Sequence, residues 1–196
     1  MKINAIKRIC LDEGECVIYN DEKTGEQWIG TTSACYPVDS GRITVTDIAG
    51  LFDIKMGKAD AMTICEEDWQ TCGIRPQRWM GDMQEYRCVE GVRIYCRGEL
   101  CDIIAYKGTA YMVRVGRRNA ARISEPYAGM FISWDRQGEP VFLIYSGFEL
   151  AGIIRPEPAE ATIQVLNEMA QIAKLDVGYI EETPTSEQTT MLEDEQ

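Results

Sequence analysis

The sequence predicts an α+β domain, rich in antiparallel β-sheet, with an N-terminal helix and a C-terminal helix packed on the sheet. Three observations support this fold class. Short segments of alternating apolar and polar side chains follow one another between turn residues, as antiparallel strands do. Apolar residues at helical spacing occur near both ends of the chain. Of the 196 residues, 45% are apolar, which is enough to build a buried core.

The first third of the chain predicts helix, strands and helix. The opening helix is expected around residues 3–10, where apolar side chains recur at helical spacing, and Gly14 follows as a stop signal. Short extended segments are expected at residues 16–19, 27–29 and 34–38. A second short helix, with Thr46 as its N-cap, is expected before residues 55–82, which follow no clear pattern.

Strand patterns dominate the second half. Residues 85–123 are expected to form strands, and a second meander is expected at residues 130–134, 141–145 and 148–154. Pro156 and Pro158 are expected to end the sheet and to precede a helix over residues 159–174. We therefore expect one domain over residues 1–175, with a subdivision open near residues 55–84, and an acidic, disordered tail over residues 176–196.

The chain contains no histidine, and this excludes several catalytic classes. A Ser-His-Asp triad, a Cys-His pair and an HExxH zinc site all need that side chain. A phosphate-binding loop is excluded as well, because the only similar step, Gly57-Lys58, is followed by Ala59 instead of Ser or Thr. The acidic residues are too numerous for any pair to stand out as catalytic. We therefore predict a protein that is not an enzyme.

Eight cysteines are many for a cytoplasmic protein, and no CxxC pair occurs among them. Free thiols packed in the core are the first expectation, because a reducing cytosol disfavours disulfides. The alternative is a structural zinc ion held by thiolates from the middle of the chain. Its candidate ligands are Cys65, Cys72, Cys88, Cys96 and Cys101. No other cofactor is expected.

The net charge of −12 is unevenly distributed. Residues 71–122 hold ten basic and five acidic side chains, a net charge of +5, whereas residues 176–196 hold seven acidic side chains and no basic one. The overall sign opposes general binding to nucleic acid. Arginines on neighbouring strands could still contact RNA or DNA locally, or they could pair with acidic side chains of the same domain. The candidates are Arg93, Arg97, Arg114, Arg117, Arg118 and Arg122.

The acidic tail contains one isolated apolar pair. Gln188 precedes Met191 and Leu192, and this pattern resembles the short peptide by which bacterial replication and repair proteins dock on the sliding clamp. The resemblance implies that the two apolar side chains enter a preformed pocket while the glutamine fixes their direction by hydrogen bonding. The tail therefore predicts a partner-binding site.

The chain also carries a wider resemblance. The segments that carry it are residues 3–10, 17–20, 27–30, 34–38, 51–54 and 148–156. In these segments the chain resembles a family of uncharacterised prophage proteins of Firmicutes. The resemblance implies a phage protein that works in the bacterial cytoplasm on a host DNA machine, and it brings no catalytic residues.

Charge and resemblance together give an order of expected functions. First is a non-catalytic inhibitor of a host defence nuclease, of the anti-CRISPR type, with a type II effector nuclease as the expected target and an acidic surface that blocks nucleic-acid access. The alternative is a phage replication or recombination accessory protein that docks on the host clamp through its tail. An enzyme that uses carboxylates or a thiolate comes last. No apolar run is long enough to span a bilayer, and no secretory signal is recognisable, so we expect a cytoplasmic protein with a host protein or ribonucleoprotein as partner.

Overall fold

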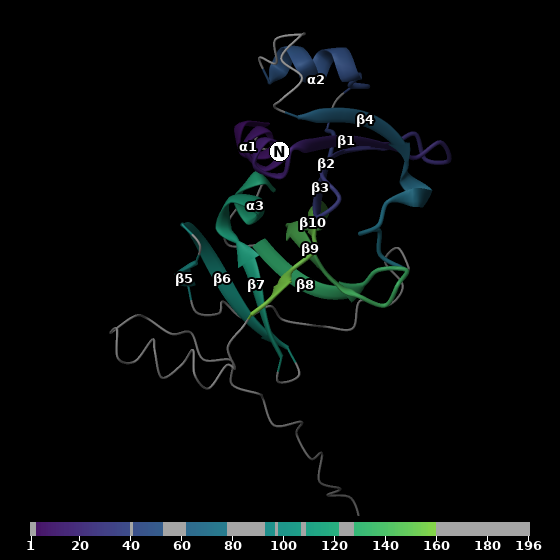
Figure 1. Ribbon diagram of the computed structural model, residues 1–196. Coiled ribbons are helices and arrows are strands. Elements are labelled where there is room, and N and C mark those ends of the chain that lie inside the picture. Colours follow the sequence, from purple (N-terminus) through teal and green to yellow (C-terminus); the bar gives the residue numbers. More distant parts are fainter. Residues whose placement is uncertain are drawn as a thin grey trace, which may run out of the picture.

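The predicted α+β fold, dominated by antiparallel sheet, is confirmed by a computed structural model of the protein (Figure 1). The structure describes residues 3–39, 41–52, 62–77, 93–96, 98–106, 109–121 and 128–159. The C-terminal helix that we predict over residues 159–174 lies, from residue 160 on, outside the described residues. So does the acidic tail.

The chain begins with helix α1, Ile3–Glu13, as the sequence predicts. Its buried side chains, Ile6, Ile9 and Cys10, form one stripe at helical spacing, because residues three and four apart share a helix face. Gly14 then takes a positive φ of 73°, which other residues rarely adopt, and the chain turns directly into the first strand.

Most strands form one seven-stranded sheet. Its members in spatial order are β4 (Thr63–Asp68), β1 (Glu15–Asn20), β2 (Gln27–Gly30), β3 (Ala34–Pro37), β10 (Glu149–Ile154), β9 (Pro140–Ser146) and β8 (Ala128–Trp134). The extended segments predicted at residues 16–19, 27–29 and 34–38 and the predicted second meander are confirmed as β1 to β3 and β8 to β10. Strand β4 lies in the stretch where the sequence showed no clear pattern. It pairs in parallel with β1, and its side chains alternate weakly because it is a largely exposed edge strand.

A smaller four-stranded sheet lies beside the first. Its order is β11 (Glu157–Pro158), β7 (Thr109–Arg114), β6 (Glu99–Tyr106) and β5 (Arg93–Cys96). The expectation that Pro156 ends the β structure is wrong, because the short strand β11 follows it and pairs with Met112 and Tyr111 of β7; Pro158 is the last residue of that strand. A proline is tolerated there because β11 is an edge strand. The expectation of strands up to residue 123 is also wrong, because residues Val115–Ala120 form helix α3.

Helix α2 spans Val45–Leu51, and its N-cap is Thr44 instead of the predicted Thr46. The Thr44 hydroxyl accepts the backbone N–H of Asp47, and the Asp47 carboxylate accepts the backbone N–H of Thr44 at 2.8 Å. Both residues satisfy an otherwise unpaired donor, so this reciprocal capping box decides where the helix begins. Ile48 is the buried residue of the helix.

The seven-stranded sheet has a core on each face. Successive side chains of a strand point to opposite faces, so Ile18 of β1 enters one core while Tyr19 enters the other. The first core includes the buried apolar residues of α1, α2 and α3. The second core lies against the short 3-10 helix η1 (Trp69–Thr71) and the residues that follow it.

We call residues 69–77 the strap, because they cross the second core from one outer strand to the other. The strap follows β4 and reaches the far strand β8, where Pro76 pairs with Asp135 and the Gln77 N–H donates to the Trp134 carbonyl. Figure 1 shows the sheet curving from β4 round to β8, with this segment between them. The strap therefore covers the second core much as the helices cover the first.

No helix within the described residues is both long and apolar enough to cross a bilayer.

Candidate partner-binding surface

The first candidate site is the set of six arginines predicted to contact nucleic acid. The structure describes the side chains of three of the six, Arg114, Arg117 and Arg118. Arg93 lies on β5 with its side chain outside the described part of the structure, and Arg97 and Arg122 lie outside it altogether.

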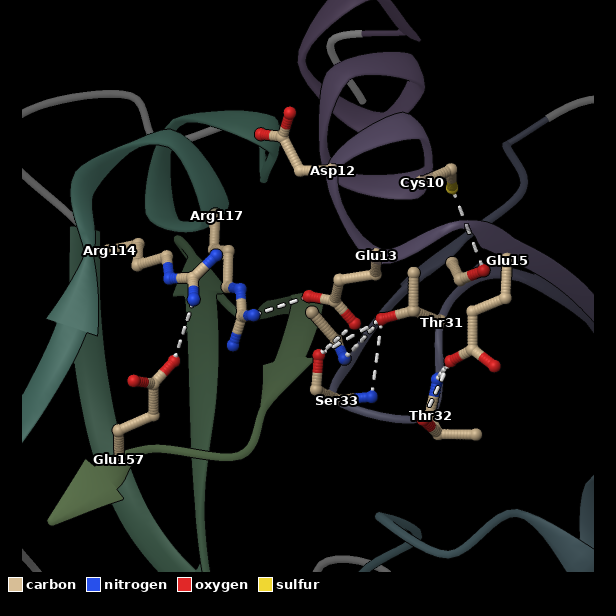
Figure 2. Close-up of polar contacts among 12 residues, drawn as sticks. Cys10, Asp12, Glu13, Glu15, Thr31, Thr32, Ser33, Arg114, Arg117 and Glu157 are labelled. Carbon is tan, nitrogen blue, oxygen red and sulfur yellow. Dashed lines mark hydrogen bonds and ion pairs between the residues drawn. The ribbon is translucent and has the colours of Figure 1, made fainter. Parts of the chain in front are cut away.

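Arg117 is held inside the domain. It lies on α3, is 5% exposed, and forms an ion pair with Glu13 at the end of α1 (Figure 2). The second carboxylate oxygen of Glu13 accepts the Ser33 hydroxyl at 2.5 Å, and Ser33 lies in the turn between β2 and β3. The guanidinium therefore joins three segments of the fold, and a phosphate group could not reach it without breaking that network.

Arg114 and Arg118 are also paired with acidic side chains. The Arg114 guanidinium lies 3.1 Å from both Glu99 and Glu157, so it connects β6 and β11, the two strands that flank its own strand β7. Arg118 lies 3.2 Å from Asp102, whose side chain is buried. These three arginines thus stabilise the domain. The sequence placed all three on strands. Arg114 does end strand β7, whereas Arg117 and Arg118 lie on helix α3, where they pair with Glu13 of α1 and Asp102 of β6.

The candidate zinc ligands are distributed over different parts of the fold. Cys65 lies half-buried on β4, Cys72 lies buried in the strap, and Cys101 lies buried on β6 of the smaller sheet. Cys88 and the side chain of Cys96 lie outside the described residues. Within the described part of the chain, no three Cys, Asp or Glu side chains gather closely enough to hold a metal ion. A structural zinc ion stays a prediction.

The predicted tail site also stays a prediction, because Gln188, Met191 and Leu192 all lie outside the described residues.

A pocket of about 870 Å³ lies on the surface beside the seven-stranded sheet. Three chain segments form it: the β1–β2 turn, the loop that follows β3, and the start of β10. The charged residues that line it are five acids and one base, namely Asp21, Glu22, Glu26, Asp39, Glu149 and Arg42. We call it the acidic pocket. The sequence did not single out these residues, because they come from three segments that only the sheet brings together.

The β1–β2 turn is built around Asp21. Its carboxylate accepts the backbone N–H of Lys23 at 2.9 Å and that of Thr24 at 3.4 Å, a local arrangement that Asp commonly makes in turns. Burial raises the pKa of Asp21, but these hydrogen bonds outweigh burial and hold the pKa below its ordinary value. The carboxylate therefore stays ionised. Gly25 completes the turn with a φ of 74°.

Gln27 fixes the loop that forms the opposite wall. Its side-chain amide donates to the Ile43 carbonyl at 2.9 Å and accepts the Ile43 N–H at 2.7 Å. The same amide donates to the Asn20 side chain at 2.8 Å. The loop is thus anchored to the sheet through a buried side chain, and the pocket is formed before any ligand arrives.

Phe148 directly precedes the residues of β10 that line the acidic pocket. It follows Gly147 at the tip of the β9–β10 hairpin and is fully exposed, with a relative exposure of 103%. The next two residues, Glu149 and Leu150, line the pocket. The sequence placed Phe148 inside a strand, whereas the structure begins β10 at Glu149 and leaves the ring in the turn. A phenylalanine directly after a Ser-Gly turn was the signal available in the sequence.

The arrangement suits binding of a basic partner. The pocket presents ionised carboxylates, which attract Lys and Arg side chains, and Phe148 presents an aromatic ring of the kind that anchors protein interfaces. A cation placed over the ring would gain a further electrostatic attraction.

Comparison with known proteins assigns no family. No family model matches the chain, and neither the curated proteins nor the solved structures contain a significant match.

Proposed function

We propose that the protein acts without catalysis, by binding a basic surface of another protein, and that its partner is a host defence nuclease whose nucleic-acid groove it covers. This is the mode of action of anti-CRISPR inhibitors, and a type II effector nuclease is the target we would test first. The observation that carries the proposal is the acidic pocket, where five acidic side chains face one arginine beside a fully exposed phenylalanine.

The distribution of charge over the molecule supports binding through an acidic surface of this protein to a basic surface of the partner. Arg114, Arg117 and Arg118 are paired with acids inside the domain, so they add little positive potential at the surface. The acidic pocket keeps an excess of negative charge. A nucleic-acid groove on a nuclease is rich in Lys and Arg, and an acidic surface is steered toward it and competes there with the natural polyanion.

The exposed aromatic ring supports a specific complex over a purely electrostatic one. Charge at the rim of an interface governs mainly the association rate and its salt dependence. Affinity comes from a few buried anchors, among which aromatic residues are common. Phe148 provides such an anchor in the chain directly before Glu149, which lines the pocket. One contact region therefore supplies both a fast association rate and affinity.

The test uses a purified type II effector nuclease loaded with guide RNA. We expect the protein to bind this complex and to inhibit cleavage of target DNA, with an affinity that falls as salt rises. The double variant Glu22→Gln/Glu149→Gln should lower the association rate roughly tenfold at low salt. The control Glu67→Gln/Glu139→Gln removes the same charge from exposed residues that do not line the pocket, and it should bind like the unmodified protein.

Two outcomes would remove the proposal. One is absence of binding to the nuclease complex even at low salt. The other is an equal loss of association rate in both double variants, because binding would then follow net charge and not the acidic pocket.

A clamp-binding accessory protein remains the second candidate, on the sequence of the tail alone. Deletion of residues 181–196 separates the two functions. Loss of binding to purified sliding clamp would support the accessory protein, whereas unchanged inhibition of the nuclease would support the inhibitor.

A further inference from the structure

Strand β5 forms one edge of the smaller sheet. It lies at the end of the strand order, and Figure 1 shows it as the outermost strand on its side. Its inner side pairs with β6, from Arg93 opposite Asp102 to Cys96 opposite Glu99. Within the described residues, no strand pairs with its outer side. Strand β5 therefore offers one side on which a further strand can pair.

The pairing register shows which backbone groups of β5 point outward. Cys96 and Glu99 flank the two-residue turn between β5 and β6, so they form a hydrogen-bonded pair. Hydrogen-bonded and non-hydrogen-bonded pairs alternate along an antiparallel ladder. The backbone N–H and C=O groups of Arg93 and Tyr95 therefore point away from β6 and toward the open side.

The opposite edge of the same sheet confirms this alternation. Counted across β6 and β7 in the same way, the backbone groups of Ala110 point away from β6 and toward β11. The Ala110 carbonyl does accept the N–H of Ala159, which directly follows β11, at 3.0 Å. The outward direction of the Tyr95 backbone therefore agrees with a hydrogen bond at the other side of the sheet.

Exposed apolar side chains accompany the open backbone groups. Tyr95 is 75% exposed, and Leu100, directly opposite it on β6, is 40% exposed. The two residues form a non-hydrogen-bonded pair, so their side chains lie close together on one face of the sheet. Exposed apolar side chains that lie together mark an interaction surface more often than single ones do. The edge thus combines unpaired backbone groups with an apolar contact.

The other sheet edges carry features that hinder pairing. Strand β4 carries three consecutive exposed acidic side chains at residues 66–68, and β11 has two residues and ends in Pro158, which has no N–H. The strap reaches β8, where the Gln77 N–H donates to the Trp134 carbonyl at 2.9 Å. Charged side chains, prolines and covering segments all protect edges from further pairing. Strand β5 has neither a proline nor a cluster of charged residues, so it is the least protected of these edges.

The surface beside β5 is close to neutral, which suits a second copy of the chain. A pocket of about 530 Å³, which Tyr95 and Leu100 help to line, lies between α1, the β5–β6 turn and α3. The charged residues that line it are three bases and two acids, namely Arg8, Arg114, Arg117, Asp12 and Glu99. Copies of a chain with a net charge of −12 repel one another least where the two signs are balanced. A basic partner is drawn instead to the acidic pocket.

We propose that two copies of the protein form a symmetric dimer by antiparallel pairing of their β5 strands, which joins the two smaller sheets into one. The register that sets Arg93 of one copy against Tyr95 of the other uses every outward-facing backbone group of both strands. Such pairing satisfies two-fold symmetry, because each contact occurs twice. Four residues bury too little surface for a stable dimer, so the face with Tyr95 and Leu100 contributes as well, and the dimer dissociates on dilution.

Sedimentation velocity of the full chain measures the dimer fraction against protein concentration, with a reducing agent present to exclude intermolecular disulfides. We expect dimer at high concentration and monomer on dilution. The variant Tyr95→Pro removes an outward N–H without breaking a bond to β6, which an edge strand tolerates, and it should stay monomeric. The variant Tyr95→Lys keeps every backbone group but sets a positive charge opposite Arg93 of the second copy. It should raise the dimer dissociation constant at least about tenfold.

The matched control is Glu66→Pro on β4. The Thr63 N–H donates to the Gly14 carbonyl at 3.0 Å, so by alternation the Glu66 N–H also points to an open side, but at the acidic edge. This variant should dimerise like the unmodified protein.

Three results would each overturn the proposal. The first is an unmodified protein that sediments as a monomer at every concentration. The second is a dimer that persists unchanged in Tyr95→Lys, which decides the matter if circular dichroism shows that Tyr95→Pro does not fold. The third is an equal loss of dimer in Glu66→Pro. No nuclease takes part in the measurement, so failure of the dimer leaves the proposed function standing, and the reverse also holds.

Discussion

The arginine-bearing region around α3 and the acidic pocket use charge in opposite ways. Around α3, Arg114, Arg117 and Arg118 each contact a carboxylate, and the ion pairs join helices and strands that are distant in the sequence. At the acidic pocket, backbone N–H groups hold Asp21, and the surrounding carboxylates outnumber the single Arg42.

This difference separates a structural role for charge from a binding role. A buried ion pair contributes mainly by avoiding an uncompensated charge, so its members cannot be spared for a ligand. Carboxylates on an exposed, preformed pocket keep their charge available to a partner. The region that the sequence marked as basic is therefore the less suitable surface for binding, and the acidic loops are the more suitable one.

The largest expected effect comes from breaking the ion pair between Glu13 and Arg117. The variant Arg117→Met leaves the partly buried Glu13 carboxylate without its partner, and we expect the free energy of unfolding to fall by about 3 kcal/mol. Urea denaturation followed by circular dichroism measures it. The double variant Glu13→Leu/Arg117→Met should recover most of the loss, because no buried charge remains unpaired. A loss below about 1 kcal/mol in the single variant would contradict an internal role for this arginine.

The next effect concerns Phe148 and separates binding from stability. The variant Phe148→Ala should weaken binding to the nuclease complex by about 2 kcal/mol, since interface anchors lose that much on truncation. Its unfolding free energy should stay within about 0.5 kcal/mol, because the ring touches solvent only. Leu51→Ala is the matched control, since Leu51 is an exposed apolar residue outside the pocket. Equal binding losses in both variants, by calorimetry, would argue against a defined contact region.

A smaller effect is expected at the capping box of Thr44 and Asp47, which begins helix α2 just after the loop that lines the pocket. The variant Thr44→Ala removes the hydroxyl that accepts the Asp47 N–H, and we expect a stability loss of about 1 kcal/mol. Thr46→Ala changes an exposed residue inside the first turn and should have little effect. Thermal unfolding of both variants compares them directly. A larger loss for Thr46 would place the helix start two residues further along.

The smallest effect is a pH dependence of the acidic region. Hydrogen bonds to the carboxylates lower the pKa of both Asp21 and Asp47. A depressed folded-state pKa adds stability above the unfolded-state pKa of about 4, and that stability is lost as the pH falls through the folded-state value. Unfolding midpoints measured from about pH 6 to about pH 3 should therefore fall less steeply for Asp21→Asn than for the unmodified protein. An identical slope would mean that the Asp21 carboxylate does not titrate differently on folding.

Local patterns predicted the elements whose signals lie within a few residues. Helix α1 has an apolar stripe and a stop glycine, and the β8–β10 meander has alternating side chains and glycine turns, so both were predictable. Strand β4 was missed because an exposed edge strand lacks a regular apolar alternation. Helix α3 was missed because its short sequence carries two arginines whose partners, Glu13 and Asp102, lie on distant elements.

The sequence by itself determined the fold class, the N-terminal helix and most strands, because hydrophobic periodicity and turn residues act between near neighbours in the chain. Only the tertiary structure decided the roles of the charged side chains. Whether an arginine is buried or a carboxylate lines a pocket depends on segments that lie far apart in the chain and meet only when the sheet forms.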